Sequence, residues 1–118
     1  MNDIVTLFDQ LGSTAVIEER LIGAATALCS CGIAYVMRYV RAATEGAVEL
    51  GIYPAKAQEY MLATMKGAIK LLESTGNNPE CEIDKVTTPG GITIKGLNAM
   101  ERAGFTTAVI EGLKASAK

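Results

Sequence analysis

The loop Thr87–Thr93 contains the residue types best suited to chemistry. It reads Thr-Thr-Pro-Gly-Gly-Ile-Thr and leads into a segment whose apolar residues have helical spacing. Two adjacent glycines let the backbone approach a ligand closely. The start of the following helix offers free N–H groups and a partial positive charge. With the threonine hydroxyls as further donors or acceptors, the loop is suited to a small anion such as a carboxylate.

A plainer explanation of this loop stays open. Pro-Gly-Gly is common turn chemistry, so on spacing alone a simple connection between helices with Thr as N-cap is the commoner outcome. The chain contains no histidine, which excludes Ser–His and Cys–His catalytic pairs. Asp84 is expected to be a surface or capping group. No G-x-G-x-x-G fingerprint for a dinucleotide phosphate is present.

Composition narrows the class of protein. The 118 residues carry 11 basic and 13 acidic side chains, mixed along the chain, for a net charge of −2. This length fits one domain, and without clustered Lys/Arg we expect no nucleic-acid partner. Cys29, Cys31 and Cys81 are expected to be reduced, small apolar residues rather than a metal site. The odd cysteine count and the absence of a signal peptide favour the cytoplasm.

The apolar pattern predicts an all-α fold. Apolar faces are wide, which suggests that a second subunit covers part of them. Leu21–Met37 has no charged residue but is shorter than a membrane span needs, so we expect no membrane association. Thr14–Ile17 could form a short strand, and Gly32 is expected to mark a break or a bend. The predicted helices are 2–12, 18–31, 33–50, 54–74, 79–86, 93–103 and one that begins near 107.

The loop and its flanks carry a family resemblance. Asp84–Ile94 resembles the signature D-x-V-T/S-S-P-G-G-T/A-T-I of pyrroline-5-carboxylate reductases. The segment Gly96–Phe105 is similar to the G-L-x-x-L-E-x-x-G-F that follows in that family. Upstream, Ala27–Val36 matches A-L-S-G-S-G-P-A-Y-V in outline, and Leu7–Gly12 is similar to the last helix of the family's nucleotide domain.

The resemblance implies a fold and a division of the chain. Residues 1–17 would be the end of the nucleotide-binding domain with its linker, including one short strand. Residues 18–118 would be the helical dimerisation and substrate-binding domain, a bundle that interlocks with a second subunit. Implied partners are a second copy, with higher oligomers open, and a small-molecule substrate.

The implied activity is that of the full-length enzyme. The family reduces the C=N bond of Δ1-pyrroline-5-carboxylate to L-proline with hydride from NADPH or NADH, a step in proline biosynthesis. The resemblance places the substrate at the loop, with the ring nitrogen on the hydroxyl of Thr93, the residue matched to the catalytic position. Because the chain has no dinucleotide fingerprint, we expect it to be inactive alone. The implied substrate-binding residues are Thr87, Thr88, Gly90, Gly91, Ile92 and Thr93.

Three departures from the family pattern affect the site. Thr88 stands where the family usually has Ser, and Ile92 replaces a small or hydroxylated residue. Cys29–Ile33 replaces Ser-Gly-Ser-Gly-Pro near the expected nicotinamide position, so a cofactor contact would involve Ser30, Cys31 and Gly32. Two other functions remain open: a non-catalytic helical homodimerisation module, or the helical domain of a related imine reductase or dehydrogenase.

Overall fold

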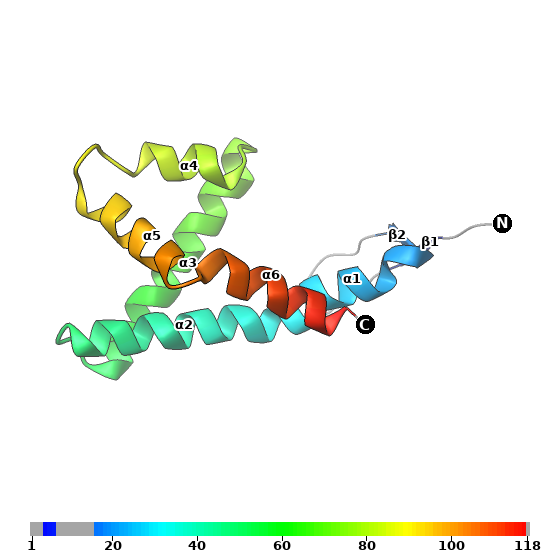
Figure 1. Cartoon of the computed structure of the whole chain (residues 1–118), viewed down its shortest axis with the longest axis horizontal. Coiled ribbons are helices and arrows are strands. Elements are labelled where there is room, and N and C mark those ends of the chain that lie inside the picture. The colour runs from blue at the N-terminus through cyan, green and yellow to red at the C-terminus, as the bar shows by residue number, and fades with distance from the viewer. Residues whose placement is uncertain (1–3, 7–15, 118) are drawn as a thin grey trace. The chain divides into compact units, whose positions relative to one another are not determined.

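The computed structural model describes residues 4–6 and 16–117, and the predicted all-α class is confirmed. Two short strands precede the helices (Figure 1). The elements are β1 (Ile4–Thr6), β2 (Val16–Glu18), η1 (Glu19–Leu21), α1 (Ile22–Thr26), the π-helical turn η2 (Ala27–Cys31), α2 (Gly32–Glu49), α3 (Pro54–Thr75), α4 (Pro79–Lys85), α5 (Ile92–Arg102) and α6 (Phe105–Ser116).

The N-terminal strands correct one prediction. β1 and β2 pair antiparallel, with Ile4 opposite Glu18 and Thr6 opposite Val16. The predicted helix 2–12 is therefore wrong at Ile4–Thr6, where β-branched residues favour an extended chain. The predicted strand at 14–17 is found at Val16–Glu18, and the expected helix at 7–12 lies outside the described residues.

The chain divides into two compact units, Met1–Tyr35 with Thr107–Lys118, and Val36–Thr106. In the first unit, a Cβ on Gly23 would lie 2.9 Å from the carbonyl oxygen of Ala117. The Tyr35 hydroxyl donates to the carbonyl oxygen of Gly112 at 3.4 Å. The break or bend predicted at Gly32 corresponds to the boundary between the π-helical turn Ala27–Cys31 and α2, and Gly32 itself has α-helical angles.

In the second unit, glycines and prolines lie at the helix boundaries. The segment after α2 turns at Gly51, which has a φ of +105°. α3 begins at Pro54, and its C-cap is Gly76, whose φ is +69° and whose N–H donates to the Leu72 carbonyl at 3.1 Å. These left-handed conformations are accessible to glycine at little cost. α4 likewise begins at a proline, Pro79.

This second unit has a thin core of its own. Among its residues only Ala57 and Thr44 are buried, and the Thr44 hydroxyl is satisfied by the Val40 carbonyl at 2.8 Å. Large apolar side chains stay accessible instead. A surface this apolar is unusual for a soluble monomer and indicates a binding partner. The exposed members include Val36, Met37, Val48, Leu50, Tyr53, Tyr60, Leu62, Ile69, Leu71, Val86 and Ile92.

One helical run, Glu19–Glu49, meets the length and composition of a membrane span. The run has 31 residues, and its most apolar 18-residue window has a mean hydropathy of 1.5 and is 6% buried within the chain. A helix that packs against another subunit meets the same criteria, because both settings replace water with apolar contacts.

Candidate functional site

The loop between α4 and α5 forms a hydrogen-bonded turn at Thr88–Gly91. The Gly91 N–H donates to the Thr88 carbonyl at 2.9 Å, and Gly90 has a φ of +74°. Pro89 precedes Gly90, so the residue types are those of a type II turn, in which the third position favours glycine. This geometry fixes the direction in which the chain enters α5.

The first turn of α5 presents unused backbone donors. Gly91 is the N-cap and no side chain accepts from the first amides, while the first turn contains no acidic residue. The N–H groups of Ile92, Thr93 and Ile94 have no intrahelical acceptors, and the positive end of the helix favours an anion. The predicted site is thus available to a carboxylate, with the Gly91 amide already engaged in the turn.

The three threonines of the loop differ in their engagement. The Thr87 hydroxyl donates to the Ile83 carbonyl at 2.9 Å, so it closes the end of α4. Its oxygen can still accept a hydrogen bond. Within the described part of the chain, the hydroxyls of Thr88 and Thr93 form no hydrogen bond. Thr93 lies in the turn of α5 that carries the free amides, which suits it to contact a bound molecule.

The loop is accessible to solvent at Ile92 and closely packed at Gly91. Ile92 is 86% exposed, so its side chain makes little contact within the chain. A Cβ on Gly91 would lie 2.5 Å from the Thr88 hydroxyl oxygen, which means that the Thr88 side chain covers Gly91 closely. Only glycine fits beneath Thr88 without displacing it.

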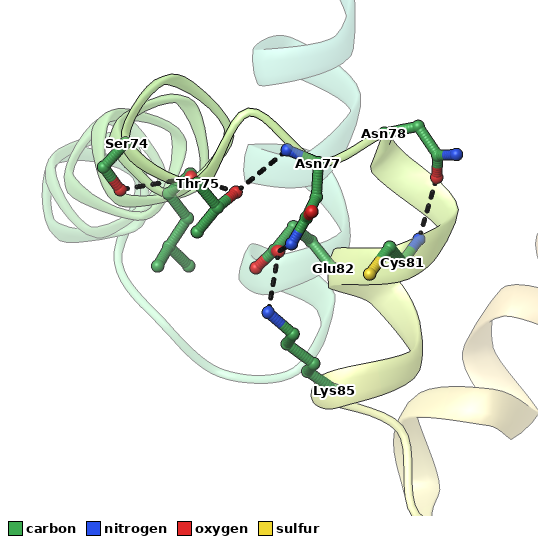
Figure 2. Close-up of polar contacts among 8 residues, drawn as sticks. Ser74, Thr75, Asn77, Asn78, Cys81, Glu82 and Lys85 are labelled. Atoms are coloured by element: carbon green, nitrogen blue, oxygen red, sulfur yellow. Dashed lines mark hydrogen bonds and ion pairs between the residues drawn. The ribbon is translucent and has the colours of Figure 1, made fainter.

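A polar network holds α4, the helix that precedes the loop, at the elbow formed by residues 76–78 between α3 and α4 (Figure 2). The Asn77 side-chain amide donates to the Glu82 carboxylate at 2.7 Å, and the Lys85 ammonium donates to the same oxygen at 3.1 Å. The Asn78 side chain accepts from the Cys81 N–H at 3.0 Å, which caps α4. The sequence predicted a turn here but not the Asn77–Glu82 contact, which depends on the turn geometry.

The two hydrogen bonds shape the electrostatics of this network. Donation from Asn77 and then from Lys85 holds the pKa of the Glu82 carboxyl below its ordinary value. The Glu82 carboxylate in turn raises the pKa of the Lys85 ammonium. Both shifts favour the charged forms, so the network is formed at neutral pH.

An apolar groove of about 720 Å³ lies between α3 and α4. Its lining includes Gly67, Ala68 and Leu71 from α3 and Ile83 from α4. Glu82 is the acidic residue in its lining, and Val86 marks the end nearest the loop. The described lining of the groove contains no residue of the loop and differs from it in character, because most of this lining is apolar and Lys70 is its one cationic side chain. The remaining lining residues are Thr64, Lys70, Leu72, Ser74 and Pro79.

The residues predicted near a cofactor belong to the other unit. Ser30 and Cys31 are half-buried in the π-helical turn, and Gly32 follows as the first residue of α2. Irregular turns of this kind are frequent at functional sites. Among the described residues, no group of three or more His, Cys, Asp or Glu side chains could hold a metal ion.

Comparison with known proteins gives a consistent result. The family described as pyrroline-5-carboxylate reductase dimerisation matches residues 19–118. Pyrroline-5-carboxylate reductase 1 of Dictyostelium discoideum is 49% identical over 110 residues, which is 93% of this chain and 20% of that protein. Pyrroline-5-carboxylate reductase 2 of Bacillus subtilis is 36% identical over 120 residues, 99% of this chain and 43% of that protein.

Solved structures support the same fold. The reductase from Streptococcus pyogenes matches with a TM-score of 0.84 and 32% identity, over 86% of this chain and 39% of that one. The pyrroline carboxylate reductase of Plasmodium falciparum, solved with NADP bound, matches with a TM-score of 0.83 and 28% identity, over 86% and 38%. The chain thus spans less than half the length of these relatives. It belongs to the pyrroline-5-carboxylate reductase dimerisation family.

Proposed function

We propose that this chain supplies the dimer interface and the substrate carboxylate site of a pyrroline-5-carboxylate reductase. The observation that carries the proposal is the start of α5, where a glycine turn precedes backbone amides that no side chain caps. The proposed substrate-binding residues are Thr87, Thr88, Gly90, Gly91, Ile92 and Thr93. Residues 18–118 would form this helical domain, and 1–17 would belong to the preceding nucleotide-binding domain.

We propose a role in binding for each group. The amides at the start of α5 would hold the carboxylate of the cyclic imine, since hydrogen bonds to a charged group contribute about 1.5–3 kcal/mol each. The Thr93 hydroxyl, which is free within the described chain, would hydrogen-bond the ring nitrogen. Two anchored ends fix the plane of a small ring, and that orientation is the main contribution the chain makes to the reaction.

The reaction needs a hydride donor from outside this helical domain. NADPH or NADH would transfer hydride to the imine carbon, and the ring nitrogen would carry the proton that completes the secondary amine of L-proline. No G-x-G-x-x-G is present for the dinucleotide phosphates, so a partner domain would bind them, with Ser30, Cys31 and Gly32 near the nicotinamide. This division predicts no NADPH oxidation by the chain alone.

The exposed apolar surface supports the dimer. Leu71, Ile69 and Tyr60 of α3 are each about half exposed, at 49%, 53% and 54%. Burial of apolar surface contributes about 25 cal/mol per Å² of stabilising free energy, so covering these side chains would stabilise a dimer. We propose that a second copy covers this surface and Glu19–Glu49, so that no membrane is a partner. The mixed charges argue against a nucleic-acid partner, and the odd cysteine count supports the proposal of a cytoplasmic location. Sedimentation without detergent should show a dimer or a multiple of it; a stable monomer would contradict this.

Calorimetric titration with three ring compounds tests the site. L-proline carries the carboxylate and the ring nitrogen, cyclopentanecarboxylate lacks the nitrogen, and pyrrolidine lacks the carboxylate. The proposal predicts binding of the first two and none of pyrrolidine, because the helix start recognises the anion. If the chain binds none of the three while still forming dimers, it is a dimerisation module without a ligand site.

A substitution separates the role of Thr93 from that of the amides. Thr93→Val keeps the shape of the side chain but removes its hydroxyl, so it should weaken L-proline and leave cyclopentanecarboxylate unchanged. Thr107→Val in α6 is the matched control and should change neither affinity. An equal loss for both ligands would place the Thr93 hydroxyl on the carboxylate instead of the nitrogen.

A further inference from the structure

We propose that Glu82 is a positioning residue for the Thr87–Thr93 loop, because its carboxylate ties the α3–α4 elbow to the last turn of α4. This inference rests on the proposed function, since it concerns the loop that would hold the substrate. Glu82 itself would touch no substrate. Its effect would pass through α4 to the backbone that carries the binding groups.

The contacts of Glu82 are tight for a surface carboxylate. One oxygen accepts from Asn77, in the turn after α3, and from Lys85, the last residue of α4. The Glu82 side chain is only 12% exposed, whereas that of Lys85 is 56% exposed. A carboxylate that is largely shielded from solvent and accepts two hydrogen bonds holds its partners more firmly than an exposed ion pair does. Figure 2 shows it lying between the elbow and the end of α4.

Ile83, the residue after Glu82, connects α4 to the loop through its carbonyl oxygen. The Ile83 carbonyl accepts from the Val86 N–H at 3.0 Å and from the Thr87 hydroxyl at 2.9 Å. The turn that begins at Thr88 therefore follows directly from the end of α4. A rotation of α4 about its axis would move Thr87 and displace the start of α5.

α4 needs this support because it is short. It has 7 residues, and a helix of that length is marginal without outside contacts. Apart from Glu82 and Ile83, its residues are exposed. Without the Asn77–Glu82 bond, the helix would be held by the Asn78 cap and by the apolar contact of Ile83. Both leave rotation about the axis less restricted than the bond to Asn77 does.

The test compares Glu82→Leu with Glu80→Leu, which makes the same change at an exposed position of the same helix. In the ligand-free chain, the exchange rate of the Gly91 amide, which bonds the Thr88 carbonyl, should rise about tenfold in Glu82→Leu. It should stay within twofold of the unchanged chain in Glu80→Leu. Glu82→Gln keeps an acceptor for Asn77 and should restore most of the protection.

The same variants are then titrated with L-proline. Glu82→Leu should raise the Kd about tenfold, with unchanged helix content by circular dichroism, and Glu82→Gln should recover most of the affinity. A purely structural role would lower Tm but leave both the Gly91 exchange rate and the Kd unchanged below the melting range, and that result would overturn the inference. The Gly91 exchange rate decides the role of Glu82 without any ligand. Failure of the unchanged chain to bind L-proline would count against the proposed function alone.

Discussion

Replacing Gly91 by alanine tests whether the close packing of Thr88 against Gly91 is needed for binding. The backbone at Gly91 has a φ of −77° and a ψ of 175°, which alanine adopts without strain. The obstacle is steric, because a Cβ would lie 2.5 Å from the Thr88 hydroxyl oxygen and 3.1 Å from the Thr88 carbonyl oxygen. Thr88 must therefore move, and the hydrogen bond from the Gly91 N–H to its carbonyl must lengthen.

The size of the effect follows from two contributions. Overpacking a well-fitted site costs about 1–3 kcal/mol, and a weakened backbone hydrogen bond costs about 0.5–1.5 kcal/mol. Because an exposed loop can relax, we expect about 1–2 kcal/mol of the total to appear as lost binding. That corresponds to a Kd for L-proline that is roughly 5- to 30-fold higher.

A double-mutant cycle identifies the cause of this loss. Thr88→Ala removes the oxygen 2.5 Å away and leaves the Thr88 Cβ at 3.7 Å, an ordinary contact, although the carbonyl remains at 3.1 Å. In the Thr88→Ala background, adding Gly91→Ala should therefore cost at most half of the binding free energy that Gly91→Ala costs in the unchanged chain. Gly96→Ala, within α5 and with no neighbouring atom within 4 Å, is the control and should bind normally.

Two results would refute this reasoning. If Gly91→Ala binds L-proline as the unchanged chain does, the packing of Thr88 against Gly91 does not matter for the site. If the loss occurs but Thr88→Ala recovers none of it, the hydroxyl contact is not its cause.

Three further predictions concern the scaffold. The folded-state pKa of Glu82 is depressed below 4.5. The network should therefore stabilise the elbow at every pH above 4.5 and lose this contribution as the pH falls through the lower, folded-state pKa. An NMR titration of the Asn77 side-chain amide would follow this loss. Asn78→Ala removes the cap of α4 and should cost about 1 kcal/mol in chemical unfolding, whereas Asn78→Asp should cost little. If a second copy covers the apolar faces, Tm should rise with protein concentration, and a constant Tm over a hundredfold dilution range would argue against an obligate dimer.

Much of the helical scaffold could be predicted from the sequence because its boundaries depend on local chemistry. Gly51 and Gly76 end helices in left-handed conformations, and Pro54 and Pro79 begin them. These preferences act within a few residues and need no knowledge of the rest of the fold. The glycine turn of the loop was predictable for the same reason.

The errors arise where distant residues or fine geometry decide. The Ile4–Thr6 strand pairs with residues about twelve positions away, so its apolar spacing alone suggested a helix. The irregular turn at Ala27–Cys31 depends on a shift in hydrogen bonding that glycine content does not reveal.

For the site, the sequence predicted a role for the loop but not the hydrogen bonds that its groups form. Thr87 remains a predicted ligand, and the structure adds that its hydroxyl donates to the Ile83 carbonyl at the end of α4. Sequence reasoning missed the Asn77–Glu82 bond, because that contact forms only when the elbow closes.

The central claim is that backbone amides at the start of α5 hold the carboxylate of a small ring. The most direct test is a titration of the ¹⁵N-labelled chain with L-proline, followed by the amide signals of the whole loop. The account predicts that the largest shifts fall at Ile92, Thr93 and Ile94, and that pyrrolidine at the same concentrations leaves these signals in place. Saturation with L-proline that moves other amides while these three stay unchanged would contradict it.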